Sequence, residues 1–218
     1  MTYVALALVA AALVLLGRWV ARPYDALGRR KSAPLVSVLV LAGVGLGLLV
    51  PVVRHARLEH RLDDVASTLV GVPVAVHCQT AGEELFDIGS ELGFVRADAA
   101  GRPERATLIK RGPCRRLADY VRSDKSSPSR DEIIAVHVLS HEARHMAGQM
   151  TEALAECEAM QRDARTAELL GADPAQARAL AAAYWDQVYP LMDDGYRTGE
   201  CAPGGPLDEH LGNGPWAD

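Results

Sequence analysis

The chain has 218 residues, of which 49% are hydrophobic and 5% aromatic, and its formal net charge is −5 at pH 7. Because its basic residues are interleaved with acidic ones, this balance argues against a surface that binds phosphates, and we expect no nucleic acid among its partners. No glycine-rich phosphate loop follows a strand-like segment either.

Two apolar segments open the chain. Residues 3–21 are almost wholly apolar before Arg18, and the long side chains of Arg18 and Arg22 can reach the membrane surface from this segment. Residues 33–53 carry no charge, so this segment is the stronger transmembrane candidate. The N-terminus lacks the basic region of a cleaved signal peptide, and we therefore expect two transmembrane helices.

The charges beside these segments indicate how the chain crosses the membrane. The loop between them holds one acid, Asp25, and five basic residues, whereas three basic residues follow the second segment. This excess favours a cytoplasmic loop, so we expect a two-pass protein of the cell membrane, in contact with the lipid bilayer, whose soluble part is extracytoplasmic. The basic residues are Arg18, Arg22, Arg29, Arg30 and Lys31 in the loop, and Arg54, Arg57 and Arg61 after the second segment.

The four cysteines support an extracytoplasmic location. Cys78, Cys114, Cys157 and Cys201 all follow the second apolar segment, and none forms a C-x-x-C pair. An even number confined to the soluble part predicts two disulfides in an oxidising compartment. Three pairings are possible. We favour Cys78 with Cys114 and Cys157 with Cys201, which join an early strand to its neighbour and a later helix to the tail.

The rest of the chain predicts one domain. About 165 residues follow the apolar segments, which is enough for a single hydrophobic core. Residues 54–70 predict an amphipathic linker helix, and residues 71–218 a domain that ends in a tail rich in glycine and proline. In this domain residues 72–78 predict a strand, and residues 94–96 and 106–110 a hairpin across a polar turn.

Four helices are predicted in the same domain. Ser129 and Glu132 have the spacing of a capping box, which starts the second of them. The predicted fold class is α+β, with two N-terminal transmembrane helices followed by a small domain of a few-stranded sheet and about four helices. These four helices cover about residues 114–121, 132–147, 152–161 and 173–189.

An H-E-x-x-H motif, formed by His141, Glu142 and His145, lies inside the second of these helices. Residues four apart share a helix face, so the two imidazoles can bind one metal ion while Glu142 acts on a water beside it. Two neutral imidazoles suit Zn²⁺, and a third protein ligand with an open water position makes such a site catalytic. His137, one turn earlier, is interpreted as a partnered helix histidine rather than a ligand.

Two acids at the start of the next helix, Glu152 and Glu156, are candidates for the third ligand. Here the chain resembles the gluzincin metallopeptidases, whose second motif is roughly E-x-x-A-D/E. The resemblance implies a zincin-like domain in which Glu152 binds zinc and Glu156 orients a ligand histidine. The exchange of these two roles is the alternative.

The spacing departs from that family, because only six residues separate His145 from Glu152. It is similar to the metzincin motif H-E-x-x-H-x-x-G-x-x-H, with Gly148 at the place of the glycine and Thr151 at that of the third histidine. The chain also resembles uncharacterised membrane-anchored actinobacterial proteins with H-E-x-x-H, E-A-x-x-E-C-x-A-x-Q and a late C-x-x-G-G-x-L-D. The last two motifs correspond to residues 152–161 and 201–208.

These resemblances imply a zinc metallopeptidase with a peptide or protein substrate. Glu142 would accept the proton of the attacking water and pass it to the leaving amine. By resemblance, Thr107–Lys110 is the candidate strand that pairs with the substrate backbone. A further donor should stabilise the oxyanion, and the sequence does not choose among its candidates. They are Tyr184, Tyr189, Tyr196 and His210.

Two other functions use the same residues. A membrane-anchored binding or scaffold protein would keep a zinc site for folding, or would retain a degenerate peptidase fold. The intact Glu142 argues against this alternative, because a purely structural site has no use for that acid. A zinc hydrolase that acts on a non-peptide amide would need the same side chains.

Overall fold

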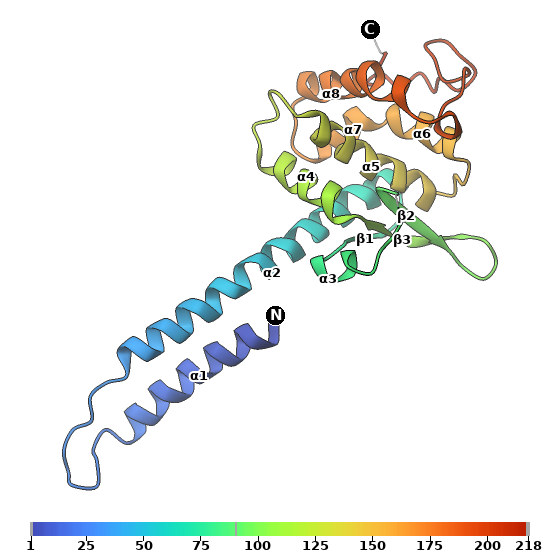
Figure 1. Ribbon diagram of the computed structural model, residues 1–218. Helices are drawn as coiled ribbons and strands as arrows, with labels where there is room; N and C mark the ends of the chain where they lie inside the picture. The colour runs from blue at the N-terminus through green and yellow to red at the C-terminus, as the bar shows by residue number, and fades with distance from the viewer. Residues whose placement is uncertain (1, 90, 217–218) are drawn as a thin grey trace. The chain divides into compact units, whose positions relative to one another are not determined.

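The computed structural model of the protein describes residues 2–89 and 91–216 (Figure 1). It has the predicted mixture of helices with a small sheet, and its contacts divide the chain into two units, Met1–Arg57 and Leu58–Asp218. In chain order the elements are α1 (Thr2–Ala21), α2 (Leu35–Val70), β1 (Ala75–Cys78), α3 (Ala81–Glu84), β2 (Gly93–Ala97), β3 (Pro103–Ile109), α4 (Arg111–Arg122), α5 (Arg130–Met146), α6 (Glu152–Met160), α7 (Asp163–Leu169), α8 (Pro174–Gln187) and the 3-10 helices η1 (Tyr189–Leu191) and η2 (Asp194–Tyr196).

The first unit consists of α1 and the N-terminal part of α2. By length and composition each of these apolar helices could span a membrane, and most of their large apolar side chains are exposed within the unit. The helices approach closely at Gly45, where an added Cβ would lie 2.8 Å from Cγ2 of Val9 and 3.0 Å from the backbone oxygen of Ala5. Small residues at such crossings let the backbones of membrane helices come together.

α2 is one continuous helix of 36 residues. The sequence predicts a span over residues 33–53 and a separate linker helix over residues 54–70, whereas the structure has one helix through both, with Pro51 inside it. A proline removes one backbone donor, which weakens a helix locally without obliging it to end.

The sheet of the second unit has the strand order β1-β3-β2. β1 is parallel to β3, and β2 is antiparallel to it, so the predicted hairpin is present. Its turn is held by Asp98, whose Oδ1 accepts hydrogen bonds from the backbone N–H groups of Ala100 and Arg102. An aspartate that binds the backbone in this way favours a tight turn.

The central place of β3 corrects one prediction. Thr107–Lys110 was interpreted as the strand that pairs with a substrate, and this is wrong because β3 is already paired with β1 on one side and β2 on the other. A strand with two neighbours has no free row of backbone groups for a peptide. The prediction failed because a local pattern does not reveal the order of strands.

The two outer strands differ at their outer edges. Along β1, the N–H of Val76 donates to Asp63 Oδ1 at 2.6 Å and that of Cys78 donates to Glu59 Oε1 at 2.8 Å. Both carboxylates come from α2, and they close this edge to another strand. The outer edge of β2 pairs with no strand in the described part of the chain.

α5 is the central helix of the second unit. The predicted capping box begins it, since the Glu132 N–H donates to Ser129 Oγ and the Ser129 N–H donates to Glu132 Oε2. α4, α6, α7, α8, β2 and β3 all contact this helix. From Ile133 to Met146 every residue except Ile134 is buried, so the polar side chains of α5 need partners inside the protein.

The second unit has more helices than the sequence predicts. α3 and α7 were not expected, because each is too short to show a helical period, although Thr80 and Glu83 form a capping box at α3. α8 ends at Gln187, short of the predicted end near Tyr189. Pro190 lies just beyond, where the chain continues as the 3-10 helix η1.

Two disulfides join distant parts of the second unit. They are Cys78–Cys114 and Cys157–Cys201, with sequence separations of 36 and 44, which is the pairing favoured from the sequence. The first joins the end of β1 to α4, and the second joins α6 to the tail. Two disulfides suit an oxidising, extracytoplasmic compartment.

Removal of the first disulfide should lower the free energy of unfolding of the second unit. With Cys78→Ala and Cys114→Ala the loop of 36 residues is no longer closed in the unfolded chain. The loop-entropy estimate for this change is about 4 kcal/mol. Urea unfolding of the full chain in detergent measures it, and the pair Cys157→Ala and Cys201→Ala should lose a similar amount. An unchanged unfolding free energy would contradict the corresponding disulfide.

Candidate metal site

α5 brings the two histidines of the motif together. The Nε2 atoms of His141 and His145 lie 2.9 Å apart, and their rings meet edge to face with centroids 4.6 Å apart. Both side chains are buried. They meet because residues four apart share one face of a helix, as the motif predicts.

A tight turn then brings in a third side chain. Gly148 has a φ of +109°, which glycine tolerates and other residues avoid, and its N–H donates to the backbone oxygen of His145. α6 begins at once, with Glu152 as its first residue. Glu152 Oε2 lies 3.1 Å from Nε2 of His141 and 3.4 Å from Nε2 of His145. Three potential ligand atoms therefore converge on one point.

The partners of the other ring nitrogens indicate where the imidazole protons lie. Nδ1 of His141 is 3.1 Å from Glu156 Oε2, and Nδ1 of His145 is 2.6 Å from the backbone oxygen of Gln149. The backbone oxygen of Gln149 accepts the Nδ1 proton of His145, and the Glu156 carboxylate attracts a proton to Nδ1 of His141, although this second contact is an ion pair without a hydrogen bond. A neutral ring protonated at Nδ1 presents a lone pair at Nε2. Two lone pairs 2.9 Å apart repel each other unless a cation, a proton or a metal ion, lies between them.

The acids around His141 attract positive charge to it. Burial alone would lower the pKa of His141, but its contacts with Glu152 and Glu156 outweigh burial and raise this pKa to about 9. The contact with His141 also lowers the pKa of Glu152, which keeps that carboxylate ionised. Without a metal, the site therefore holds a proton where a metal ion would bind.

The donor set and its distances fit a metal ion. His141, His145 and Glu152 each offer one ligand atom, and these atoms lie within 4.8 Å of one another. Two nitrogens at the usual Zn–N distance in a tetrahedral site are about 3.3 Å apart. The observed separations of 2.9, 3.1 and 3.4 Å bracket this value.

Glu142 turns from α5 toward the sheet. It is 3% exposed, and its Oε2 accepts a hydrogen bond of 3.0 Å from Thr107 Oγ1 of β3. Burial raises the pKa of Glu142 to about 7, although the nearby His141 and the bond from Thr107 act in the opposite direction. A carboxylate with a pKa near 7 is suited to accept and return a proton at neutral pH.

Gly93, the first residue of β2, is a site residue that the sequence analysis does not name. A Cβ at Gly93 would lie 2.8 Å from Glu142 Oε1 and 3.1 Å from its Cγ. The edge strand therefore passes directly against this carboxylate, and the glycine allows the close approach. In the sequence, this residue is only a glycine before a short apolar segment. Glycine is common at such places because turns need it, so nothing in the sequence assigned Gly93 to the site.

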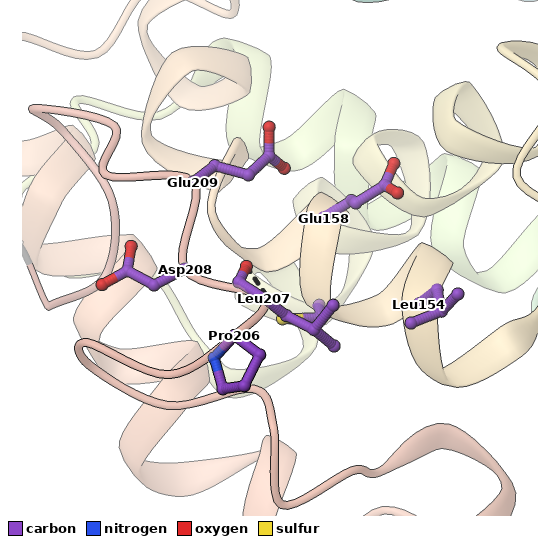
Figure 2. A pocket seen from close by; sticks show the side chains of 7 residues that line it. Leu154, Glu158, Pro206, Leu207, Asp208 and Glu209 are labelled. Carbon is purple, nitrogen blue, oxygen red and sulfur yellow. Dashed lines mark hydrogen bonds between the residues drawn. The ribbon is translucent and has the colours of Figure 1, made fainter.

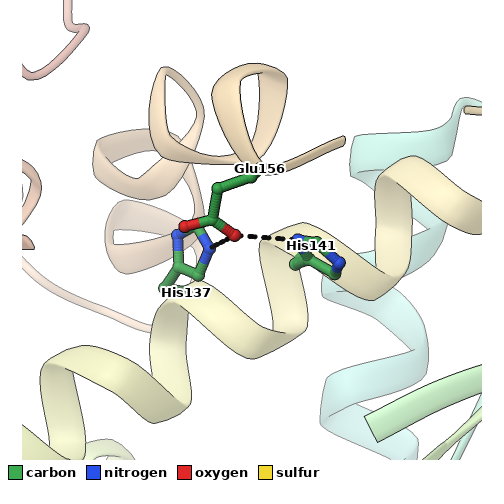
Figure 3. Close-up of side chains that lie close together, drawn as sticks. All are labelled: His137, His141 and Glu156. Carbon is green, nitrogen blue, oxygen red and sulfur yellow. Dashed lines mark hydrogen bonds and ion pairs between the residues drawn. The ribbon is translucent and has the colours of Figure 1, made fainter. Parts of the chain in front are cut away.

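Glu156 of α6 lies between two histidines of α5 (Figure 3). Its Oε2 is 2.9 Å from Nε2 of His137 and 3.1 Å from Nδ1 of His141. Glu156 thus faces Nδ1 of His141, whereas Glu152 faces Nε2. This geometry favours Glu152 as the ligand and Glu156 as the partner that orients His141, and both roles stay predictions. His137, His141 and Glu156 form a second group that could hold a metal ion. In this group each ring nitrogen faces a carboxylate oxygen rather than another ring nitrogen, so protons can occupy these contacts without an ion.

Three of the four candidates for the oxyanion donor have other contacts. The Tyr184 hydroxyl donates to Glu156 Oε1 at 2.6 Å, and the Tyr189 hydroxyl donates to the backbone oxygen of Thr198 at 3.3 Å. The side chain of His210 is 78% exposed and contacts a carboxylate of the tail. These contacts support a packing or surface role for each.

Tyr196, in η2, is the candidate whose ring lies near a histidine of the metal group. Its ring centroid is 6.0 Å from that of His141. Burial, with the nearby carboxylates of Glu152 and Glu156, raises the pKa of Tyr196, so its hydroxyl keeps its proton and can donate it in a hydrogen bond. The sequence could not select it, because the path of the tail decides its place.

A shallow pocket of 170 Å³ lies between α6 and the tail (Figure 2). None of the predicted metal ligands lines it, so we assign it no part in the site. Arg162 forms an ion pair with Glu209 beside it and fastens the tail to this side of the domain. The lining residues are Leu154, Cys157, Glu158, Pro206, Leu207, Asp208 and Glu209.

Comparisons with protein families, with curated proteins and with solved structures find no match to this chain. The proposal of a function therefore depends on the side chains described above and on their geometry.

The full chain, purified in detergent and supplied with zinc, should contain about one zinc ion, the number that one set of three protein ligands holds. His141→Ala removes the nitrogen that lies closest to both other ligand atoms, and it should contain almost none. Atomic emission on the folded proteins measures this. His60→Ala, which changes an exposed histidine of α2, is the matched control and should bind zinc like the wild type. A folded wild type without zinc would contradict the site.

Proposed function

We propose that this chain is a membrane-anchored zinc metallopeptidase that hydrolyses peptide bonds outside the cytoplasm. The observation that carries the proposal is the convergence of His141 Nε2, His145 Nε2 and Glu152 Oε2, with a buried carboxylate, Glu142, whose pKa responds to the charges of His141 and Glu152. Two imidazoles and one carboxylate leave a fourth position of a tetrahedral zinc ion open, which is typical of catalytic sites.

Glu142 is the general base of this proposal. Zinc, held by His141, His145 and Glu152, supplies Lewis acidity to the water and the carbonyl group when it is bound. Glu142 accepts the proton of the attacking water and passes it to the nitrogen of the leaving amine. The water oxygen becomes bonded to the carbonyl carbon and the C–N bond breaks, so that one carboxylic acid and one amine are formed.

The neighbours of Glu142 hold it in place for this task. The hydroxyl of Thr107 donates to Oε2, while Oε1 lies against the backbone at Gly93. A carboxylate fixed in this way loses little conformational freedom when the proton moves. The pKa of about 7 lets it act both as base and as acid near neutral pH.

The outer edge of β2 is where we place the substrate. β3 is paired on both sides, and α2 carboxylates occupy the outer edge of β1, whereas β2 pairs only with β3 in the described part of the chain. Gly93 brings β2 into contact with Glu142. A peptide added as an extended strand along β2 would therefore run beside the general base.

Tyr196 is the donor that we assign to the oxyanion. Its ring lies near His141 in a half-buried position, and its hydroxyl stays protonated because its pKa is raised. In known enzymes, a hydrogen bond to the negative charge that develops on the carbonyl oxygen stabilises the transition state by about 3 kcal/mol.

The location follows from the first unit and the disulfides. α1 and the apolar part of α2 are long and apolar enough to span a membrane, and the excess of basic residues in the loop between them favours a cytoplasmic loop. The second unit then lies outside the cytoplasm, where its disulfides are stable. The partners of the chain in this proposal are the lipid bilayer and a peptide or protein substrate.

Glu142→Gln should abolish hydrolysis and leave zinc binding intact, because the amide keeps the shape of the side chain but cannot accept the proton. The expected loss in kcat is about 10²- to 10⁴-fold. Cleavage of a peptide mixture by the full chain in lipid nanodiscs, followed by mass spectrometry, measures it. Glu168→Gln, whose side chain is 24% exposed on α7 and pairs with Arg165 rather than with a residue of the candidate site, is the control with unchanged activity. Zinc binding without any hydrolysis in the wild type would instead favour a scaffold with a structural zinc site.

Gly93→Ala should reduce hydrolysis without loss of zinc, because the new methyl group meets Glu142 Oε1 at 2.8 Å and displaces it. A misplacement of a catalytic group by about 1 Å can cost about 100-fold in rate. The same peptide cleavage assay tests this. Gly112→Ala, where an added Cβ meets nothing within 4 Å, is the matched control. Full activity in Gly93→Ala would show that β2 does not position the general base.

A further inference from the structure

His137 lies one turn before His141 and contacts three other helices. Its Nδ1 is 2.8 Å from Asp163 Oδ2 of α7, and its Nε2 is 2.9 Å from Glu156 Oε2 of α6. The ring of Tyr184 of α8 stacks on it, with centroids 3.7 Å apart and planes 13° apart. The side chain is 3% exposed. The imidazole therefore joins α5 to α6, α7 and α8 at one point.

Both ring nitrogens of His137 face carboxylate oxygens, and this geometry favours a proton on each nitrogen. Burial alone would lower the pKa of His137, but Asp163 and Glu156 outweigh burial and raise it to about 10. Asp163 and Glu156 are almost wholly buried, and burial raises the pKa of Asp163 although the ring of His137 acts in the opposite direction. A buried carboxylate without a cation or several donors is strongly destabilising.

The contacts of Glu156 fix both of its oxygens. The Oε2 atom of Glu156 accepts a hydrogen bond from His137 and contacts Nδ1 of His141. The Oε1 atom accepts a hydrogen bond of 2.6 Å from the Tyr184 hydroxyl. Glu156 is 1% exposed, so water does not replace any of these partners. The carboxylate therefore keeps one orientation toward His141 only while its donors on α5 and α8 remain.

We propose that His137 is a positioning residue for the metal group. Supported by Asp163, it holds Glu156 against Nδ1 of His141, and this contact turns Nε2 of His141 toward the point where Nε2 of His145 and Oε2 of Glu152 converge. The chain of contacts runs from Asp163 through His137 and Glu156 to His141. A shift of α7 would therefore change the orientation of His141 in the metal group. This inference rests on the proposed function, because it concerns the same site.

A merely structural role of His137 would make different predictions. A core histidine supports the packing of four helices, and its loss would lower the stability of the fold without changing the metal affinity of the folded molecules. A positioning residue changes the ligand itself. Loss of a group that orients a ligand histidine typically weakens metal binding by about 10- to 100-fold.

The test is the zinc affinity of the full chain in detergent, measured by competition with a chromophoric chelator, together with the visible spectrum of bound Co²⁺. His137→Gln should bind zinc about 10-fold or more weakly and shift the Co²⁺ bands, because His141 is no longer held in one orientation. Asp163→Asn should change both measurements in the same direction. Ser67→Ala is the matched control, since it removes a part-buried hydrogen bond to the backbone N–H of Val74, just before β1, and none of the contacts of Glu156.

If His137→Gln does not fold, Tyr184→Phe tests the same contacts of Glu156 in a variant that keeps its packing. It retains the stacked ring and loses only the hydroxyl that reaches Glu156, so zinc affinity should fall by about fivefold, the effect of one hydrogen bond. Wild-type affinity and an unchanged Co²⁺ spectrum in the folded variants would overturn the inference. A wild type that binds zinc but cleaves no peptide contradicts only the proposed function. A wild type that binds no zinc overturns both.

Discussion

The enclosure of α5 is the constraint on which the rest of this site depends. Other elements cover almost every face of the helix, so its histidines and Glu142 cannot be solvated. Buried polar groups need partners inside the protein, and each of these side chains has found one on a neighbouring helix or strand. Glu156 and Glu152 come from α6, Asp163 from α7, and Thr107 from β3. The positions of these elements are therefore tied to the geometry of the metal group.

Local patterns explain how much of the site could be predicted. The H-E-x-x-H spacing, the turn at Gly148 and the acid at the start of the next helix all lie within a short stretch of chain. Their geometry follows from helix periodicity and from the freedom of glycine, without reference to distant residues. The convergence of His141, His145 and Glu152 is such a case, although their metal remains a proposal.

Contacts between distant segments explain what could not be predicted. Thr107 reaches Glu142 across a separation of 35 residues, and Gly93 meets the same carboxylate from another strand. Neither contact leaves a periodic signal in the sequence. The central place of β3 and the choice of Tyr196 depend in the same way on the order of strands and the path of the tail. Short helices such as α3 and α7 escape detection because they hold too few turns to show a period.

The closure of one edge of the sheet limits how copies of the chain can associate. Asp63 and Glu59 occupy the backbone donors of β1, so a second copy could extend the sheet only by pairing its own β2 with this one. Such a contact joins identical surfaces about a two-fold axis and uses the open edge of both copies. It ends with two chains and cannot grow into a fibre. Self-association of this kind and a peptide on β2 are mutually exclusive, since both need the same row of backbone groups.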